Sequence, residues 1–152
     1  MAKILVADDD ADIRQIVSYA LVEAGHEVAV TKDGDETAAR LASAEPPELL
    51  VLDLMLPGLD GYDILEQMRG ANIRDMTRVL VISAQSSEKD ARLTLELGAD
   101  SFLPKPFDPA ELVAKVEELL AMDVHELARL RDQEHDRALL LSQLENIFDS
   151  SP

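Results

Sequence analysis

Residues 49–53 read LLVLD, four consecutive apolar side chains followed directly by an aspartate. Apolar residues on successive rather than alternate positions are typical of a strand buried on both faces. We therefore predict a strand over Leu49–Leu52 that ends at Asp53. Four similar runs, separated by segments of helical period, lie at Lys3–Ala7, Glu27–Thr31, Arg78–Ile82 and, more briefly, around Ser101–Leu103. Strands that alternate with helices predict an α/β protein with a doubly wound, five-stranded parallel sheet.

Helix boundaries between these strands are marked by residues that cap or stop a helix. Polar residues that accept main-chain N–H bonds precede the helical segments, and glycine or proline follows them. The expected helices run from Asp10 to about Ala24, from Gly34–Asp35 to the Pro46–Pro47 pair, from Gly61 to Arg69, from Ser86 or Ser87 to Gly98, and onward from Asp108–Pro109.

The pattern changes from Met122 onward. Asp123 to Glu126 reads as a fresh helix start, and helix-forming sequence continues to about Phe148, a length of roughly 40 Å at the rise of an α-helix. We therefore expect a domain over residues 1–121 and a helical extension over residues 122–152. Its apolar residues do not sustain a heptad, which disfavours a long coiled coil and leaves open whether the helix packs on its own domain or on a second copy. The two apolar groups are Val116, Leu119 or Leu120, Val124, Leu127 and Leu130, and then Leu139, Leu140, Leu141, Leu144, Ile147 and Phe148, separated by the polar stretch Arg131–Arg137.

Composition excludes several classes of function. The net charge is −17, from 31 acidic against 14 basic residues, which disfavours direct binding to nucleic acid. The chain has no cysteine, so disulfides, thiolate metal sites and thiol catalysis are excluded. It contains no secretory signal and no apolar run of about 18 residues, so we expect no membrane contact and a cytoplasmic location.

Polar side chains stand at four strand ends that share one edge of the predicted sheet. Asp8 and Asp9 follow the first strand, Asp53 the third and Ser83 the fourth, while Lys105 lies after the fifth. Three carboxylates brought together repel each other unless a cation binds them, and an all-oxygen ligand set favours Mg²⁺, for which Mn²⁺ can substitute. A carboxylate beside such an ion can accept a phosphoryl group, with Lys105 and Ser83 stabilising the charge. Asp53, on the central strand, is the expected nucleophile.

Five segments in order resemble the response regulator receiver domain of two-component signalling, over about residues 1–121. They are Ile4–Asp10, Asp53–Gly61, Val81–Ala84, Gly98–Asp100 and Lys105–Phe107. The resemblance implies a flavodoxin-like strand order 2-1-3-4-5 and a cis Lys105–Pro106 bond. It assigns Asp53 as the phosphoacceptor and Asp9, Asp53 and the Met55 backbone carbonyl as direct metal ligands, with Asp8 a ligand mostly through water. It also assigns Ser83 and Lys105 as groups that bind the phosphoryl group. The switch residues that it implies are Ser83 and Phe102.

The resemblance also implies a function. A histidine kinase or phosphotransfer protein would donate the phosphoryl group to Asp53. The new charge would then switch the face formed by the fourth helix, fifth strand and fifth helix, together with the C-terminal helix. We expect this switch to control homodimerisation or the binding of a downstream protein partner. The chain is not expected to be an enzyme with a substrate of its own.

Two alternatives remain open at this stage. A haloacid-dehalogenase-type phosphatase places its nucleophile in an Asp-x-Asp motif, which Asp8 and Asp10 satisfy formally. An interaction scaffold could keep the fold without ever being phosphorylated. Three histidines lack any partner pattern and are expected to face solvent: His26, His125 and His135.

Overall fold

The computed structural model describes residues 2–70, 76–85 and 87–149. Its strands form one parallel sheet in the order β2-β1-β3-β4-β5, which confirms the predicted doubly wound topology. The strands are β1 (Lys3–Ala7), β2 (Glu27–Thr31), β3 (Leu49–Asp53), β4 (Arg78–Ser83) and β5 (Ser101–Pro104). The helices are α1 (Ala11–Glu23), α2 (Gly34–Leu41), α3 (Gly61–Gly70), α4 (Glu88–Glu96), α5 (Pro109–Leu120) and α6 (Val124–Asp149).

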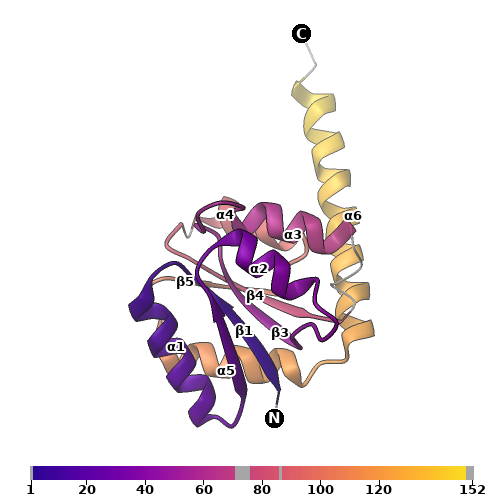
Figure 1. Ribbon diagram of the computed structural model, residues 1–152. Coiled ribbons are helices and arrows are strands. Elements are labelled where there is room, and N and C mark those ends of the chain that lie inside the picture. The colour runs from indigo at the N-terminus through magenta and orange to yellow at the C-terminus, as the bar shows by residue number, and fades with distance from the viewer. Residues whose placement is uncertain (1, 71–75, 86, 150–152) are drawn as a thin grey trace.

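Helices cover both faces of the sheet, with α1 and α5 on one face and α2, α3 and α4 on the other (Figure 1). Successive strand residues point to opposite faces, so β1 sends Ile4 and Val6 to one core and Leu5 and Ala7 to the other. Both cores are closed by helix side chains. This two-sided burial explains why the strands are apolar at consecutive positions.

The strand register brings the carboxyl ends of the central strands to a common edge. Ala7 pairs with Leu52, Asp53 with Ile82, and Ser83 with Pro104. The residues that follow these positions therefore meet at one rim of the sheet, where parallel α/β folds bind their ligands.

Side-chain caps mark the starts of α1 and α4 as predicted. The helix α2, in contrast, ends earlier than the sequence predicted. The Asp10 carboxylate accepts N–H bonds from Asp12 and Ile13 at the start of α1, and Ser87 caps α4, while Ser86 lies outside the described residues. The prediction that α2 continues to the Pro46–Pro47 pair was wrong, because the helix ends at Leu41, its last buried apolar residue. Just after the end of α2, the hydroxyl of Ser43 donates a hydrogen bond to the Arg40 carbonyl at 2.8 Å.

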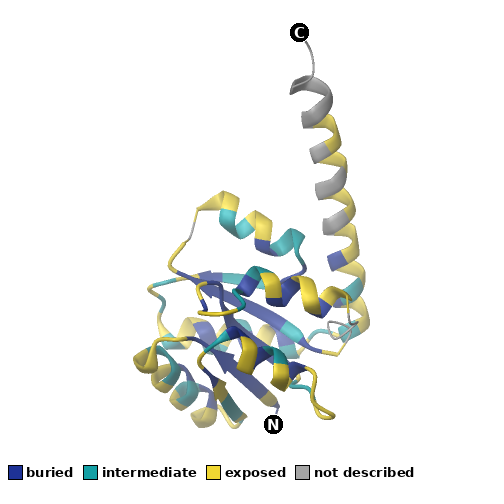
Figure 2. Cartoon of the chain, turned by 45° about the horizontal axis from the view of Figure 1, so that its top comes forward, coloured by how far each residue is buried: buried dark blue, intermediate teal, exposed yellow. Residues whose placement is uncertain are grey.

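The first turns of α6 pack against the domain, and its second half extends away from it (Figures 1 and 2). Leu127 and Arg131 are buried, with 4% and 5% of their surface exposed. Farther along the helix, Leu140, Leu141 and Leu144 are exposed. The side chains of Leu139, Ile147 and Phe148 lie outside the described residues. In the described part of the chain, no helix has both the length and the apolar character that a membrane crossing requires.

His26 does not face solvent, contrary to the expectation from the sequence. Its Nε2 lies 2.7 Å from Glu117 Oε1 in α5, and its Nδ1 accepts the main-chain N–H of Ala2 at 3.2 Å. The side chain is only 7% exposed, and both of its ring nitrogens meet partners, the Glu117 carboxylate and the Ala2 main chain. His125 is exposed as predicted, and the side chain of His135 lies outside the described residues.

Candidate functional site

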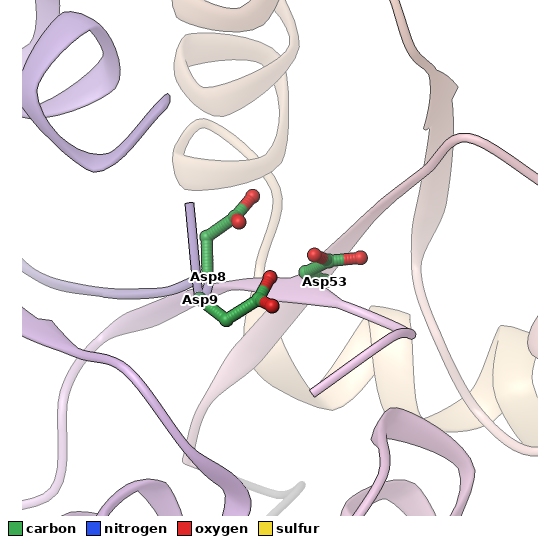
Figure 3. Close-up of side chains that lie close together, drawn as sticks. All are labelled: Asp8, Asp9 and Asp53. Atoms are coloured by element: carbon green, nitrogen blue, oxygen red, sulfur yellow. The ribbon is translucent and has the colours of Figure 1, made fainter. Parts of the chain in front are cut away.

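Three aspartates form an acid cluster at the carboxyl ends of β1 and β3 (Figure 3). Carboxylate oxygens of Asp8, Asp9 and Asp53 all lie within 4.8 Å of one another. Asp8 and Asp53 are almost completely buried, whereas Asp9 is exposed. The sequence prediction that these acids converge is thus met by the structure, and the cluster opens to solvent on the side of Asp9.

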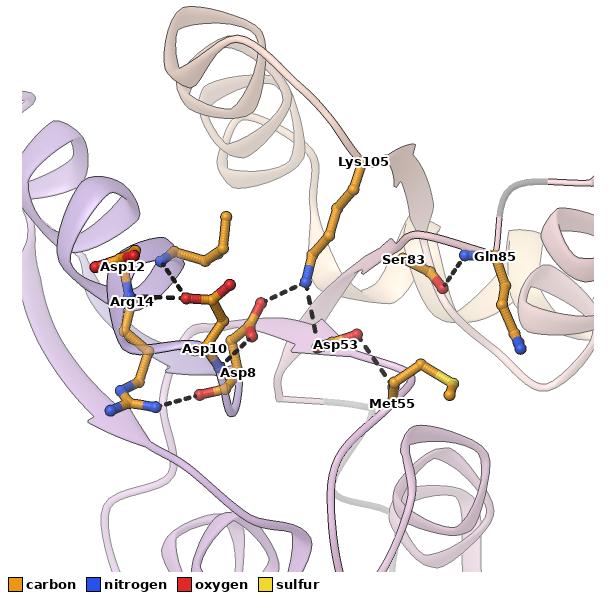
Figure 4. A network of polar contacts seen from close by, with 10 residues as sticks. Asp8, Asp10, Asp12, Arg14, Asp53, Met55, Ser83, Gln85 and Lys105 are labelled. Atoms are coloured by element: carbon orange, nitrogen blue, oxygen red, sulfur yellow. Dashed lines mark hydrogen bonds and ion pairs between the residues drawn. The ribbon is translucent and has the colours of Figure 1, made fainter.

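Lys105 reaches this acid cluster from the loop after β5 (Figure 4). Its ammonium lies 2.8 Å from Asp8 Oδ2 and 3.2 Å from Asp53 Oδ2. The main-chain N–H of Lys105 donates to the Ser83 carbonyl at 2.8 Å, and the Lys105–Pro106 peptide bond is cis. The loop backbone is therefore tied to β4, and the lysine bridges two of the three carboxylates.

The second oxygen of Asp53 and the Ser83 hydroxyl accept main-chain N–H bonds. Asp53 Oδ1 accepts from Met55 at 3.1 Å, and Ser83 Oγ accepts from Gln85 at 3.0 Å. Ser83 is buried at the end of β4, on the opposite side of Asp53 from Asp8 (Figure 4). Because Ser83 accepts the Gln85 bond through its oxygen, its own O–H can still act as a donor.

Burial and neighbouring charges change the acidity of both groups that face each other here. Burial raises the pKa of the Asp53 carboxyl, and the negative charge of Asp8 raises it further. The Met55 N–H and Lys105 both lower this pKa, but they do not outweigh the effect of burial and Asp8. For Lys105, burial lowers the pKa, but the hydrogen bond to Asp8 and the charges of Asp53 and Asp8 outweigh burial, so the pKa stands above its usual value. The buried carboxylate is thus short of compensating positive charge, while the lysine is held protonated.

The donor set fits a hard divalent cation. Three carboxylates face a single ammonium, which leaves two negative charges in the cluster. All the side-chain donors are oxygens, and Asp9 is accessible to solvent, as an ion that retains water ligands requires. Among the described residues, no other group of histidines or acids combines in this way.

Arg14 was not singled out from the sequence, although it contacts this site. Its guanidinium donates to the main-chain carbonyl of Asp8 at 2.8 Å (Figure 4). The sequence does place a basic residue in the first turn of the helix that follows the acidic run. By itself, however, such a residue looks like an ordinary exposed arginine.

A family model of the response regulator receiver domain matches residues 4–117, the same stretch that forms the sheet and the acid cluster. The chain belongs to the response regulator receiver family. Its receiver domain is the phosphorylation-based signalling module of two-component systems, which confirms the resemblance drawn from the sequence. In this family the module acts as a signalling phosphoacceptor.

Individual relatives agree with this membership. Over 118 residues, the receiver is 42% identical to the alkaline phosphatase synthesis transcriptional regulatory protein PhoP of Bacillus subtilis, a match that covers 78% of this chain and 48% of PhoP. The chain therefore spans about half the length of that relative. The receiver domain of Francisella response regulator 1452 superposes with a TM-score of 0.73 at 36% identity, covering 78% of this chain and 96% of that one. The BeF₃-activated receiver domain of DrrB, from Thermotoga maritima, has a TM-score of 0.71 at 33% identity, covering 80% and 99%.

Two other predicted positions do not join the acid cluster. Phe102 is half-buried and packs on the core that α2, α3 and α4 cover. Asp10, which the phosphatase alternative paired with Asp8, uses its carboxylate to cap α1. The phosphatase alternative therefore has no support from the geometry of Asp10.

Proposed function

We propose that this receiver accepts a phosphoryl group on Asp53, as the switch of a phosphorelay. The observation that carries the proposal is the position of Asp53 between the acids of β1 and the hydroxyl of β4, with Lys105 3.2 Å from its carboxylate. A carboxylate oxygen of Asp53 attacks the phosphorus of a phosphohistidine. The P–N bond breaks and its electron pair returns to the ring, the imidazole leaves as a neutral group that keeps the proton on its other nitrogen, and an acyl phosphate forms on Asp53.

Asp9, Asp53 and the Met55 backbone carbonyl would hold Mg²⁺ directly, or Mn²⁺ in its place, and Asp8 would hold it mostly through water. When bound, the ion neutralises charge on the oxygens of the phosphoryl group in transfer. Support comes from the acid cluster, from its two uncompensated charges and from the main chain of residue 55, whose N–H already contacts Asp53.

Lys105 and Ser83 supply the remaining stabilisation. The Lys105 ammonium shifts from the carboxylates toward the new phosphoryl oxygens, which carry more charge than Asp53 alone. The Ser83 O–H donates to another of these oxygens and moves toward the site. Ser83 ends β4, and Lys105 lies in the loop after β5. A displacement of these two residues therefore changes the packing of Phe102 in β5, and through it the position of α4, β5 and α5.

The phosphoryl donor would be a histidine kinase or a phosphotransfer protein. An apolar hollow adjoins Lys105 between α1 and the loop before α5, and a partner helix could bury an apolar residue there while it presents its phosphohistidine to Asp53. The residues that line this hollow are Ile13, Ile16, Val17, Ala84, Lys105, Pro106, Phe107 and Pro109. Cytoplasmic action remains part of this proposal.

The output would pass through residues 122–152, which we treat as an element distinct from the receiver at 1–121. The first turns of α6 pack beside α4, so a movement of the α4–β5–α5 face changes the support of α6. We propose that the switch controls homodimerisation or the binding of a downstream protein partner, without direct contact to nucleic acid by this chain.

Intact-mass measurement after treatment with acetyl phosphate tests the central step. The wild-type chain should gain one phosphoryl group in the presence of Mg²⁺ and none with EDTA. Asp53→Asn should gain none, whereas Asp10→Asn, which alters only a helix cap, should behave as wild type. Phosphorylation of Asp53→Asn at the wild-type rate would disprove the assignment, and no phosphorylation of the wild type would favour the scaffold alternative.

A further inference from the structure

Gly34, the first residue of α2, touches the loop that follows Asp53. Its main-chain N–H donates to the Pro57 carbonyl at 3.0 Å. A Cβ on Gly34 would overlap the Leu59 carbonyl oxygen and stand 2.5 Å from the Leu59 carbonyl carbon. The obstacle is backbone, which cannot turn aside like a side-chain tip, and Gly34 is not among the glycines with positive φ. Close approach, rather than backbone conformation, requires glycine here.

The loop itself, residues 54–60, carries the backbone of residue 55 next to the phosphoacceptor. Its start is fixed, because Leu54 donates to Ile82 at 3.3 Å and accepts from Gly61 at 3.0 Å. The middle of the loop is held by α2 through the Gly34–Pro57 bond.

The second residue of α2, Asp35, also lies close to this loop. Gly58 has a φ of +78°, and a Cβ there would stand 2.9 Å from Asp35 Oδ2. Two consecutive residues of α2 thus lie beside this loop. A methyl group added to Gly34 would force the loop and the helix apart, whereas a methyl group on Gly58 would meet only the Asp35 carboxylate, a side-chain tip that can turn aside.

We propose that Gly34 is a positioning residue for the phosphoacceptor site. It lets α2 hold the loop, and with it the main chain of residue 55, in place beside Asp53. This inference rests on the proposed function, in which the Met55 carbonyl is a metal ligand. Coupling between two sites is reciprocal, so metal binding at the acid cluster must in turn strengthen the Gly34–Pro57 contact.

Amide hydrogen exchange on the wild-type chain tests this reciprocity directly. Addition of Mg²⁺ should slow exchange of the Gly34 amide by about fivefold or more, within the usual range of coupling between sites. The Ala42 amide, which bonds to Ala38 at the other end of α2, is the internal control and should not change. Equal exchange of Gly34 with and without Mg²⁺ would overturn the inference, as would equal slowing at Ala42.

Substitution provides the second test. Gly34→Ala should weaken Mg²⁺ binding by roughly tenfold, the effect expected when support of a metal ligand is lost. Isothermal titration with Mg²⁺ alone measures this, at a temperature where circular dichroism shows each variant folded. Gly70→Ala, where a Cβ meets nothing within 4 Å, should bind as wild type. Leu41→Ala, which loosens the buried far end of α2, should lose stability but keep its Mg²⁺ affinity within about twofold.

The outcomes separate a positioning role from a merely structural one. A folded Gly34→Ala with wild-type Mg²⁺ affinity would overturn the inference, and so would an equal loss of affinity in Leu41→Ala. If Gly34→Ala does not fold, the exchange measurement on the wild type decides. Failure of the wild type to bind Mg²⁺ would overturn the proposed function and this inference with it, whereas Mg²⁺ binding to which Gly34 is indifferent would overturn the inference alone.

Discussion

Arg131 of α6 forms a two-pronged ion pair with Asp100, the residue before β5. Arg131 Nε lies 2.6 Å from Asp100 Oδ1, and Nη2 lies 2.6 Å from Oδ2. Both side chains are almost fully buried, and the same carboxylate accepts the Val79 N–H at 2.8 Å. Arg131 Nη2 also donates to the Thr77 carbonyl at 3.3 Å. This pair fastens the first part of α6 to the base of β4 and β5.

The Arg131–Asp100 pair predicts that Arg131→Met destabilises the receiver. Loss of one partner leaves the Asp100 charge buried and only partly compensated, which costs about 3–5 kcal/mol in the free energy of unfolding. Urea denaturation measures this value. The matched control is Arg129→Met, because Arg129 is largely exposed and stands 3.7 Å from Glu126, so its loss should change stability by under about 1 kcal/mol. Similar stability of the two variants would refute an anchoring role.

Asp53→Asn should stabilise the receiver at pH 7 in the absence of Mg²⁺, by about 0.5–2 kcal/mol, the usual gain for a stabilising substitution. Burial raises the Asp53 pKa in the folded state, so the folded chain loses stability as pH rises from 3.8 through that raised pKa. Above it, the charged carboxylate carries its full penalty, which asparagine removes. Below 3.8 the gain should vanish, because the carboxyl is then protonated in both states. Melting temperatures against pH in EDTA measure the effect, with the exposed Asp132→Asn as control; a less stable Asp53→Asn at pH 7 would contradict it.

Lys105→Met should lose about 2 kcal/mol of stability at pH 7 in EDTA, because two buried carboxylates lose their shared hydrogen-bonding cation. The Lys105 pKa is raised, so its contribution is complete below 10.5 and is lost as pH rises through the raised value. Mg²⁺ should restore much of the deficit, since it replaces the missing positive charge. Thermal melts with and without Mg²⁺ decide, with exposed Lys89→Met as control. A deficit that Mg²⁺ leaves unchanged would argue against metal binding in the acid cluster.

Mg²⁺ should stabilise the wild-type receiver by about 2.7 kcal/mol at a concentration of 100 times its dissociation constant. Asp9→Asn should remove most of this gain yet leave stability in EDTA unchanged, because Asp9 is exposed and its removal disturbs no packing. Asp12→Asn, an exposed acid in the first turn of α1, serves as control and should keep the gain. Full Mg²⁺ stabilisation in Asp9→Asn would exclude Asp9 as a ligand.

Much of this receiver follows from local patterns in the sequence. Consecutive apolar residues predicted the strands, and Asp10 and Asp108 predicted the starts of α1 and α5 through their caps. The convergence of Asp8, Asp9 and Asp53 was also predictable. It depends only on parallel strands ending at the same edge, and the alternation of strands with helices predicts that the strands are parallel.

Tertiary structure alone decided the roles of Arg131, His26 and Gly34. Arg131 lies in a polar stretch that reads as a solvated helix face, and only packing brings it to Asp100, 31 residues earlier. His26 meets Glu117 across 91 residues, and Gly34 approaches the backbone of a loop from another βα unit. A polar or small residue looks the same in a sequence whether water or protein surrounds it. The pattern of apolar residues determined the sheet and its acidic edge, while burial and partners of single polar residues depended on long-range contacts that no local pattern records.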